Sequence, residues 1–163
     1  GTSTNETRLG GVGDLWHIIK KENIKEDILV ILGDNLFNFD LNEFVSFFKK
    51  VNSTLIGVYD IKNLEDAKRF GIVDVENSKV ISFTEKPSVP KSTLASVGVY
   101  IYPAREIDAI GNYMKTDNPK DGPGNLIRHF VDSKKDVYTF ILPGFWYDIG
   151  DKKTYEELNL RGI

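Results

Sequence analysis

With 163 residues, 40% of them hydrophobic and 28% charged, the chain is long enough for one globular domain with a substantial buried core. The formal charge of -3 gives no broad basic field, which argues against nucleic acid as a partner. The absence of cysteine excludes disulfides, thiolate metal sites and cysteine nucleophiles. Without a signal peptide or an apolar run near the roughly 20 residues that span a bilayer, we expect a cytoplasmic protein with no membrane partner.

Hydrophobic spacing predicts helices and strands in alternation along the first half of the chain. A helix is expected over 12–21, followed by a strand over 28–32, a helix over 41–51, a strand over 54–59 and a short helix over 64–69. The run at 28–32 is a continuous stretch of branched aliphatic residues. That pattern is typical of a parallel strand covered on both faces.

An antiparallel hairpin interrupts this alternation. The turn residues Asn77 and Ser78 lie between two runs of alternating apolar positions, which indicates two paired strands. Beyond the hairpin we expect a strand over 96–103, helices over 105–114 and 124–131, a strand over 137–142 and a closing helix over 152–160. The chain is therefore predicted to form one α/β domain, 1–163, with a mixed sheet.

Two aspartates are the strongest candidates for a metal site. Asp34 follows the strand at 28–32, and Asp148 follows a second apolar run in the segment FWYDIG. In open α/β sheets, ligands bind at the carboxyl ends of strands, so the two carboxylates are expected to meet there. Magnesium needs only one or two protein carboxylates when waters and phosphate oxygens complete its shell. The pair therefore predicts a magnesium site.

A third segment suggests a phosphorylated sugar as ligand. In SFTEKP, Lys86 could neutralise a phosphate while Glu85 accepts hydrogen bonds from sugar hydroxyls, although an exposed ion pair would give the same sequence. Gly71 is either a turn glycine or a place where a missing Cβ lets the backbone approach a ligand. Gly10 and its neighbouring glycines lack the spacing of a phosphate loop, and a backbone contact to a nucleobase is the better interpretation.

Six segments in this order resemble the sugar-1-phosphate nucleotidyltransferases, the family of glucose-1-phosphate thymidylyltransferase and UTP-glucose-1-phosphate uridylyltransferase. The matching segments are RLGGVGDL (8–15), ILVILGDN (28–35), FGIV (70–73), VISFTEKP (80–87), LASVGVYIYP (94–103) and FWYDIGD (145–151). The resemblance implies a Rossmann-related α/β fold with a mixed, mainly parallel sheet flanked by helices. It also implies an enzyme that joins a nucleoside triphosphate, UTP or dTTP, to a sugar 1-phosphate and releases pyrophosphate with Mg²⁺.

The resemblance also implies roles for individual residues. Asp34 and Asp148 match the magnesium ligands, Glu85 the acceptor of sugar hydroxyls and Lys86 the contact to the sugar phosphate. The remaining matches are Gly10 as a backbone contact to the base, Gly71 and Val97 as walls of the sugar pocket, and Asn35 beside the metal.

One part of the family pattern has no counterpart here. Family members open with a strand and a Gly-rich loop that carries an arginine, followed by a Pro-Lys pair, and these cations stabilise the transferring phosphate. We therefore expect an N-terminally incomplete chain, the C-terminal part of a catalytic domain, with its catalytic groups upstream of Gly1 and no activity alone. The strand at 28–32 should then have an unpaired edge, and the chain should pair with the missing fragment, form a homo-oligomer or else carry an apolar patch.

Two other functions remain open from the sequence. A non-catalytic module that binds nucleotide sugars would keep the same pocket. A metal-dependent glycosyltransferase would also place an aspartate at a strand end, but such enzymes usually hold two carboxylates close together, whereas here Asn35 follows Asp34. The sequence does not specify the base or the sugar, beyond glucose 1-phosphate as the sugar substrate that the resemblance favours.

Overall fold

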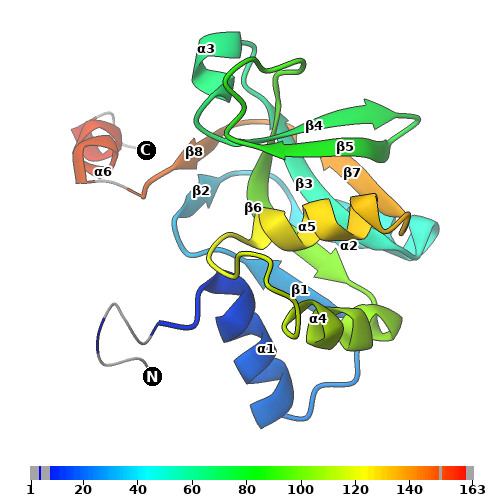
Figure 1. Cartoon of the computed structure of the whole chain (residues 1–163). Helices are drawn as coiled ribbons and strands as arrows, with labels where there is room; N and C mark the ends of the chain where they lie inside the picture. Colours follow the sequence, from blue (N-terminus) through cyan, green and yellow to red (C-terminus); the bar gives the residue numbers. More distant parts are fainter. Residues whose placement is uncertain (1–3, 5–7, 151, 161–163) are drawn as a thin grey trace.

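The strands form two sheets of unequal size (Figure 1). The computed structural model describes residues 4, 8–150 and 152–160. The six-stranded sheet has the order β1 (Ile28–Ile31), β6 (Leu94–Tyr102), β3 (Thr54–Asp60), β7 (Val137–Ile141), β5 (Lys79–Glu85) and β4 (Gly71–Glu76). The small sheet pairs β2 (Asn35–Phe37) with β8 (Trp146–Asp148).

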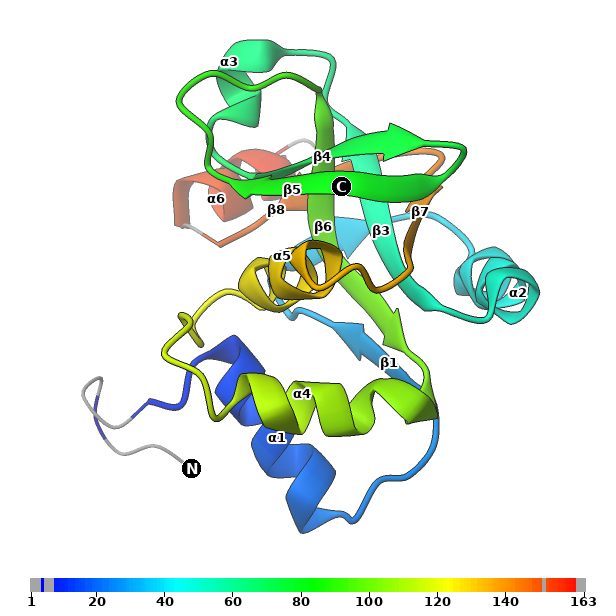
Figure 2. The same ribbon diagram turned by 45° about the vertical axis from the view of Figure 1, so that its right-hand side comes forward.

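Helices cover both faces of the larger sheet (Figures 1 and 2). α1 (Gly11–Lys21), α4 (Ile107–Tyr113) and α5 (Pro123–Asp132) pack on one face, and α2 (Leu41–Val51) packs on the other. A single turn of 3-10 helix, η2 (Ala104–Glu106), leads into α4. The other helices among the described residues are α3 (Leu64–Ala67) and α6 (Lys152–Leu160). The result is a three-layer arrangement of helix, sheet and helix.

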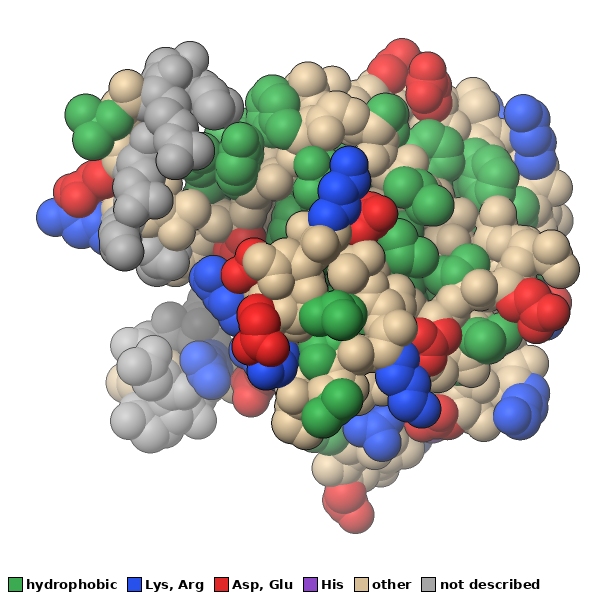
Figure 3. All heavy atoms as spheres, turned by 90° about the horizontal axis from the view of Figure 1, so that it is seen from above, with side chains coloured by type: hydrophobic (Ala, Val, Ile, Leu, Met, Phe, Trp, Pro, Cys, Tyr) green, Lys and Arg blue, Asp and Glu red, His purple; other side chains and the backbone are tan. Residues whose placement is uncertain are grey.

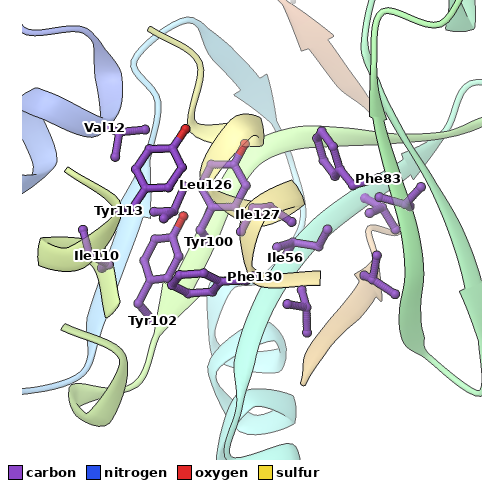
Figure 4. Close-up of a cluster of buried hydrophobic side chains, with 14 of the residues drawn as sticks. Val12, Ile56, Phe83, Tyr100, Tyr102, Ile110, Tyr113, Leu126, Ile127 and Phe130 are labelled. Carbon is purple, nitrogen blue, oxygen red and sulfur yellow. The ribbon is translucent and has the colours of Figure 1, made fainter. Parts of the chain in front are cut away.

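Alternation along β6 explains why both faces are apolar. Val97, Val99 and Ile101 join the core beneath α2, whereas Tyr100 and Tyr102 join the core beneath α1, α4 and α5. Successive side chains of a strand point to opposite faces, so one apolar strand serves two cores. Figure 4 shows the second of these cores, with the two tyrosines of β6 close to the side chains of α4 and α5.

Local signals in the sequence fix the ends of α2. The Asp40 carboxylate accepts a hydrogen bond of 2.8 Å from the Asn42 backbone N–H, which satisfies one of the free donors of the first turn. At the other end Asn52 adopts the left-handed conformation, with φ at 45°, and its N–H bonds back to the Phe48 carbonyl. Between these caps, the apolar face of the helix buries Phe44 and Phe48.

The expected mixed α/β sheet with flanking helices is confirmed, and so is the hairpin of β4 and β5, whose turn residues Asn77 and Ser78 both have positive φ. Among the described strand pairs, only β3 with β7 is parallel. The expectation of a parallel, doubly covered strand at 28–32 is wrong. This strand, β1, runs antiparallel to β6 and lies at the edge of the sheet, and Leu29 and Ile31 are each 40% exposed.

Two surface properties bear on the classes of partner. None of the described helices is both long and apolar enough to cross a membrane. On the face seen in Figure 3, acidic and basic side chains are interspersed, with hydrophobic groups between them, and they do not gather into one basic patch. This distribution agrees with the small net charge of -3 and gives no electrostatic footprint for nucleic acid on that face.

Candidate functional site

A cavity of about 190 Å³ brings together all the predicted site residues except Gly10. Its walls come from the carboxyl end of β1, the small sheet, the hairpin of β4 and β5, the middle of β6 and the start of α5. The predicted residues that line it are Asp34, Asn35, Gly71, Glu85, Lys86, Val97 and Asp148. Residues as far apart in the sequence as Asp34 and Asp148 therefore share one site.

The small sheet places the two aspartates next to each other. Asn35 of β2 lies opposite Asp148 of β8, and the Ile149 N–H donates a 2.8 Å hydrogen bond to the Asp34 carbonyl. The side chains converge on Gly150. A Cβ on this glycine would lie 3.0 Å from Asp148 Oδ1 and 3.9 Å from Asp34 Oδ2, so both carboxylates lie within 4 Å of one point.

This pair suits a magnesium ion that retains other ligands. Asp34 Oδ2 and Asp148 Oδ1, which lie near one another at Gly150, are hard oxygen donors of the kind that Mg²⁺ prefers, and Asp148 Oδ1 also accepts a 2.9 Å hydrogen bond from the Gly150 N–H. The described residues contain no cluster of three or more acidic or histidine side chains that would form a closed metal cage. A cation here would thus depend on water and on phosphate oxygens of a ligand to complete its shell.

The side chain of Asn35 forms hydrogen bonds with three other residues of the protein. Its amide nitrogen donates to the Leu32 carbonyl at 3.1 Å and to Asp34 Oδ1 at 2.9 Å, while its amide oxygen accepts a 2.7 Å bond from the indole of Trp146. Asn35 contacts the Asp34 carboxylate directly.

The Glu85 carboxylate lies in a slot formed by two glycines. A Cβ at Gly71 would be 3.0 Å from Glu85 Oε2, and a Cβ at Gly124 would be 2.9 Å from the same oxygen. Phe83 presents its ring to both glycines as well. Desolvation raises the pKa of Glu85 above its ordinary value, and the charge of Lys86 opposes this shift. Gly71 is therefore needed for close packing against Phe83 and Glu85, a role that differs from both the turn and the ligand approach considered from the sequence.

Two cations line the cavity. Lys86 has a φ of 45°, unusual for a residue with a side chain, and its N–H bonds to the Phe70 carbonyl at 3.0 Å. Arg69 lies beside it in the cavity wall, with its guanidinium 5.7 Å from the centre of the Phe70 ring. The cavity thus combines carboxylates for a cation with positive groups for a phosphate.

Sequence reasoning missed several lining residues, chiefly Arg69, Gly98, Tyr100, Trp146 and the segment 122–124. Burial raises the pKa of Tyr100 to about 12, and the negative charges of Glu85 and Asp34 add to this shift. The Tyr100 hydroxyl lies 3.4 Å from the Ser96 hydroxyl. Gly98, the glycine inside the apolar run SVGVY, could have indicated this part of the site from the sequence, because glycine in a strand often marks a bulge or a close approach of another group. Gly98 has φ at 70° and adjoins Asn35.

Gly10 lies outside this cavity. Its φ is 76°, and a Cβ there would lie 2.6 Å from the Lys120 carbonyl oxygen, so the backbone of residues 120–121 packs directly against it. The N–H groups of Gly11 and Val12 donate to the Asp121 and Lys120 carbonyls, each at 3.0 Å. The same loop continues into the cavity wall at 122–124. Asp151, the last residue of the segment 145–151, lies outside the described residues.

Several solved structures share the fold of this chain. A protein from Bacillus anthracis, assigned as a glucose-1-phosphate thymidylyltransferase and solved in complex with sucrose, matches with a TM-score of 0.74 and 24% identity over 93% of this chain and 61% of its own. The UTP-bound UDP-glucose pyrophosphorylase of Acinetobacter baumannii matches with a TM-score of 0.76 and 23% sequence identity, over 94% of this chain and 56% of its own length. An apo UDP-glucose pyrophosphorylase matches with a TM-score of 0.79 and 19% sequence identity, over 96% of this chain and 60% of its own length.

These matches establish the fold, and the chain spans 56–61% of the length of these structures. A family model described as nucleotidyl transferase matches residues 7–161, nearly the whole chain and all the segments that surround the cavity. This chain therefore belongs to the nucleotidyl transferase family.

Proposed function

We propose that this chain supplies the metal-binding carboxylates and the sugar-phosphate pocket of a sugar-1-phosphate nucleotidyltransferase. The substrates would be glucose 1-phosphate and a nucleoside triphosphate, UTP or dTTP. The observation that carries the proposal is the convergence of Asp34 and Asp148 with Glu85 and Lys86 on one cavity. Family membership and the fold shared with glucose-1-phosphate thymidylyltransferase and UDP-glucose pyrophosphorylase support it.

In the proposed reaction, an oxygen of the sugar phosphate attacks the α-phosphorus of the nucleoside triphosphate. The bond from that phosphorus to the bridging oxygen breaks, and pyrophosphate leaves with the electron pair. The attacking phosphate oxygen is already anionic, so no proton has to be removed by a base. The protein therefore contributes mainly position and charge stabilisation.

Each lining residue has a task in this scheme. Asp34 and Asp148 would hold Mg²⁺, which when bound offsets the negative charge of the phosphates. Lys86 would bind the sugar phosphate, and Glu85 in its slot would accept hydrogen bonds from sugar hydroxyls. Gly71 and Val97 would form part of the wall of the sugar pocket. Gly10, at the start of α1, remains our proposed backbone contact to the base.

Arg69 adds a second cation that the sequence motifs did not identify. It lines the cavity together with Lys86, so the phosphate would meet two positive groups. Both Arg and Lys bind phosphate, but Arg can offer a bidentate contact. We therefore assign Arg69 to the phosphate region of the site within this proposal.

Calorimetric titration of glucose 1-phosphate into the chain, with Mg²⁺ present, tests the pocket. Lys86→Ala should weaken binding roughly tenfold or more, because a hydrogen bond to a charged group contributes about 1.5–3 kcal/mol. Lys91→Ala is the matched control, since Lys91 lines a different groove next to Val89 and should leave the affinity unchanged. Equal affinities for Lys86→Ala and the unsubstituted chain would overturn the assignment. Because the chain alone is expected to be inactive, pyrophosphate release with UTP or dTTP would be measured on a longer protein that contains it, and would separate transfer from mere binding of nucleotide sugars.

A further inference from the structure

We propose that Trp146, Asn35 and Asp34 form a hydrogen-bond relay in which Asn35 is a positioning residue for the cation-binding carboxylate. This inference rests on the proposed function, because it concerns the same pair of aspartates. It adds a task for two side chains that are not themselves cation ligands. The relay sets how Asp34 is turned before a cation binds.

The chemistry of the indole fixes the orientation of the Asn35 amide. An indole N–H can only donate, and Trp146 Nε1 lies 2.7 Å from Asn35 Oδ1. The amide oxygen must therefore face Trp146, and the amide nitrogen must face the opposite way. There it meets two acceptors, the Leu32 carbonyl and the Asp34 carboxylate. The one side-chain atom of Asn35 that could coordinate a cation is thus turned towards Trp146.

The two oxygens of Asp34 consequently have different surroundings. Oδ1 accepts the 2.9 Å hydrogen bond from Asn35, whereas Oδ2 is the oxygen that faces the space at Gly150, together with Asp148 Oδ1. A carboxylate that could rotate freely would present either oxygen and would lose entropy when a cation bound. Asn35 removes that freedom in advance, as residues that hydrogen-bond to metal ligands do in metal sites generally.

Packing holds the donor end of the relay in place. Trp146 is only 8% exposed, and its ring lies 5.2 Å from that of Phe70 and 6.0 Å from that of Tyr59, centre to centre. At the other end, a Cβ on Gly98 would lie 2.8 Å from Asn35 Nδ2, so the bulge glycine of β6 leaves the room that the amide occupies. The relay is therefore supported by β8, β2 and β6.

The first test is a ¹⁵N-edited NMR titration of the chain with Mg²⁺. The sequence contains two tryptophans, so the spectrum has two indole N–H signals. Cation binding at Asp34 and Asp148 should shift the Trp146 indole signal through Asn35, together with the Gly150 amide, which donates to Asp148 Oδ1. The Trp16 indole, which packs against Gly111, should not move. In Asn35→Ala the Trp146 response should disappear while the Gly150 response remains.

The second test is a double-mutant cycle on Mg²⁺ affinity. Trp146→Phe keeps a ring against Phe70 but deletes the donor, and Asn35→Ala deletes the relay outright. Asn35→Ala should lower the affinity about tenfold or more, as loss of a residue that hydrogen-bonds to a metal ligand typically does. Trp146→Phe should lower it by a smaller factor, and the double variant should be no weaker than Asn35→Ala alone. Trp16→Phe is the matched control and should bind as the unsubstituted chain does.

The outcomes separate the relay from the site it serves. Additive losses in the cycle, or unchanged affinity in both single variants while the Gly150 amide still responds to Mg²⁺, would overturn the relay and leave the cation site standing. The absence of any Gly150 response would overturn the cation site and the relay together. In the unsubstituted chain, a Gly150 response to Mg²⁺ without any shift of the Trp146 indole signal would also overturn the relay, and this result needs no variant that folds.

Discussion

The glycine slot around Glu85 provides a substitution whose effect follows directly from the geometry. In Gly71→Ala the new methyl carbon would lie 2.5 Å from Phe83 Cζ, whereas carbon atoms in contact prefer about 3.5–4.0 Å. The ring would have to retreat by about 1 Å or more. It has little room, because the same ring atom lies 2.7 Å from the Cβ position of Gly124. The methyl group would also approach Glu85 Oε2 to 3.0 Å and push the carboxylate out of its slot.

Overpacking of this kind costs about 1–3 kcal/mol of folding free energy. For a chain of this size, that corresponds to a lowering of Tm by about 2 to 12 °C in a thermal unfolding scan. Binding of glucose 1-phosphate should also weaken roughly tenfold, since the displaced carboxylate no longer meets the sugar hydroxyls. Gly33→Ala is the matched control, because a Cβ there has no neighbour within 4 Å, and its Tm should change by less than about 1 °C.

A double-mutant cycle checks the physical cause. Phe83→Leu removes the ring atoms that meet the new methyl group, so Gly71→Ala should cost clearly less in the Phe83→Leu background than in the original chain. If the two losses simply add, the clash with Phe83 is not the reason for the destabilisation. An unchanged Tm and unchanged sugar-phosphate affinity in Gly71→Ala would refute the slot altogether.

Two further predictions concern stability. Burial raises the pKa of Glu85 above its ordinary value of 4.5, so the folded chain binds a proton at this carboxyl more tightly than the unfolded chain does. The free energy of unfolding therefore falls as the pH rises from 4.5 through the raised pKa. Urea unfolding should therefore find Glu85→Gln more stabilised, relative to the unsubstituted chain, at pH 7 than at pH 4, and an equal difference at both pH values would contradict this cause. Ser78 has φ at 64° in the hairpin turn, so Ser78→Gly, which creates the Asn-Gly pair that such turns favour, should raise stability by about 1 kcal/mol; a loss of stability would argue against backbone strain there.

Periodicity predicted most of the helices and strands because these segments bury one face or both. The helix at 41–51 is found with the expected bounds, and so is the closing helix at 152–160. The hairpin was predictable because Asn77 tolerates the left-handed conformation that its turn requires. The grouping of Asp34, Asp148 and Glu85 at one cavity could be anticipated from their positions after strands.

The partner and direction of β1 could not be predicted from its own residues. A short run of branched aliphatic residues suits any well-covered strand, and the sequence does not encode that its neighbour is the antiparallel β6. The alternating exposure of Leu29 and Ile31 follows from the position of the strand at the edge of the sheet. Strand direction here depends on a pairing between residues about 70 positions apart.

The small sheet could not be predicted either, because strands of three residues are too short to show an alternation of apolar and polar positions. Its register joins Asn35 to Asp148, and the bond from Trp146 to Asn35 spans 111 residues. Such a contact is created by the folded chain and leaves no local pattern. For the same reason, the sequence motifs placed Asn35 beside the metal but did not show that its amide serves Asp34 and Trp146.

The central claim is that the carboxylate pair and the sugar-phosphate residues form one site. The most direct measurement is the paramagnetic relaxation that Mn²⁺, as a substitute for Mg²⁺, causes at the ³¹P nucleus of glucose 1-phosphate in the presence of the chain. We expect a strong enhancement above that of Mn²⁺ and glucose 1-phosphate alone, and its loss in the double variant Asp34→Asn, Asp148→Asn. It should also be lost in Lys86→Ala, which retains the cation but releases the sugar phosphate. An enhancement that persists undiminished in both variants would contradict a shared site.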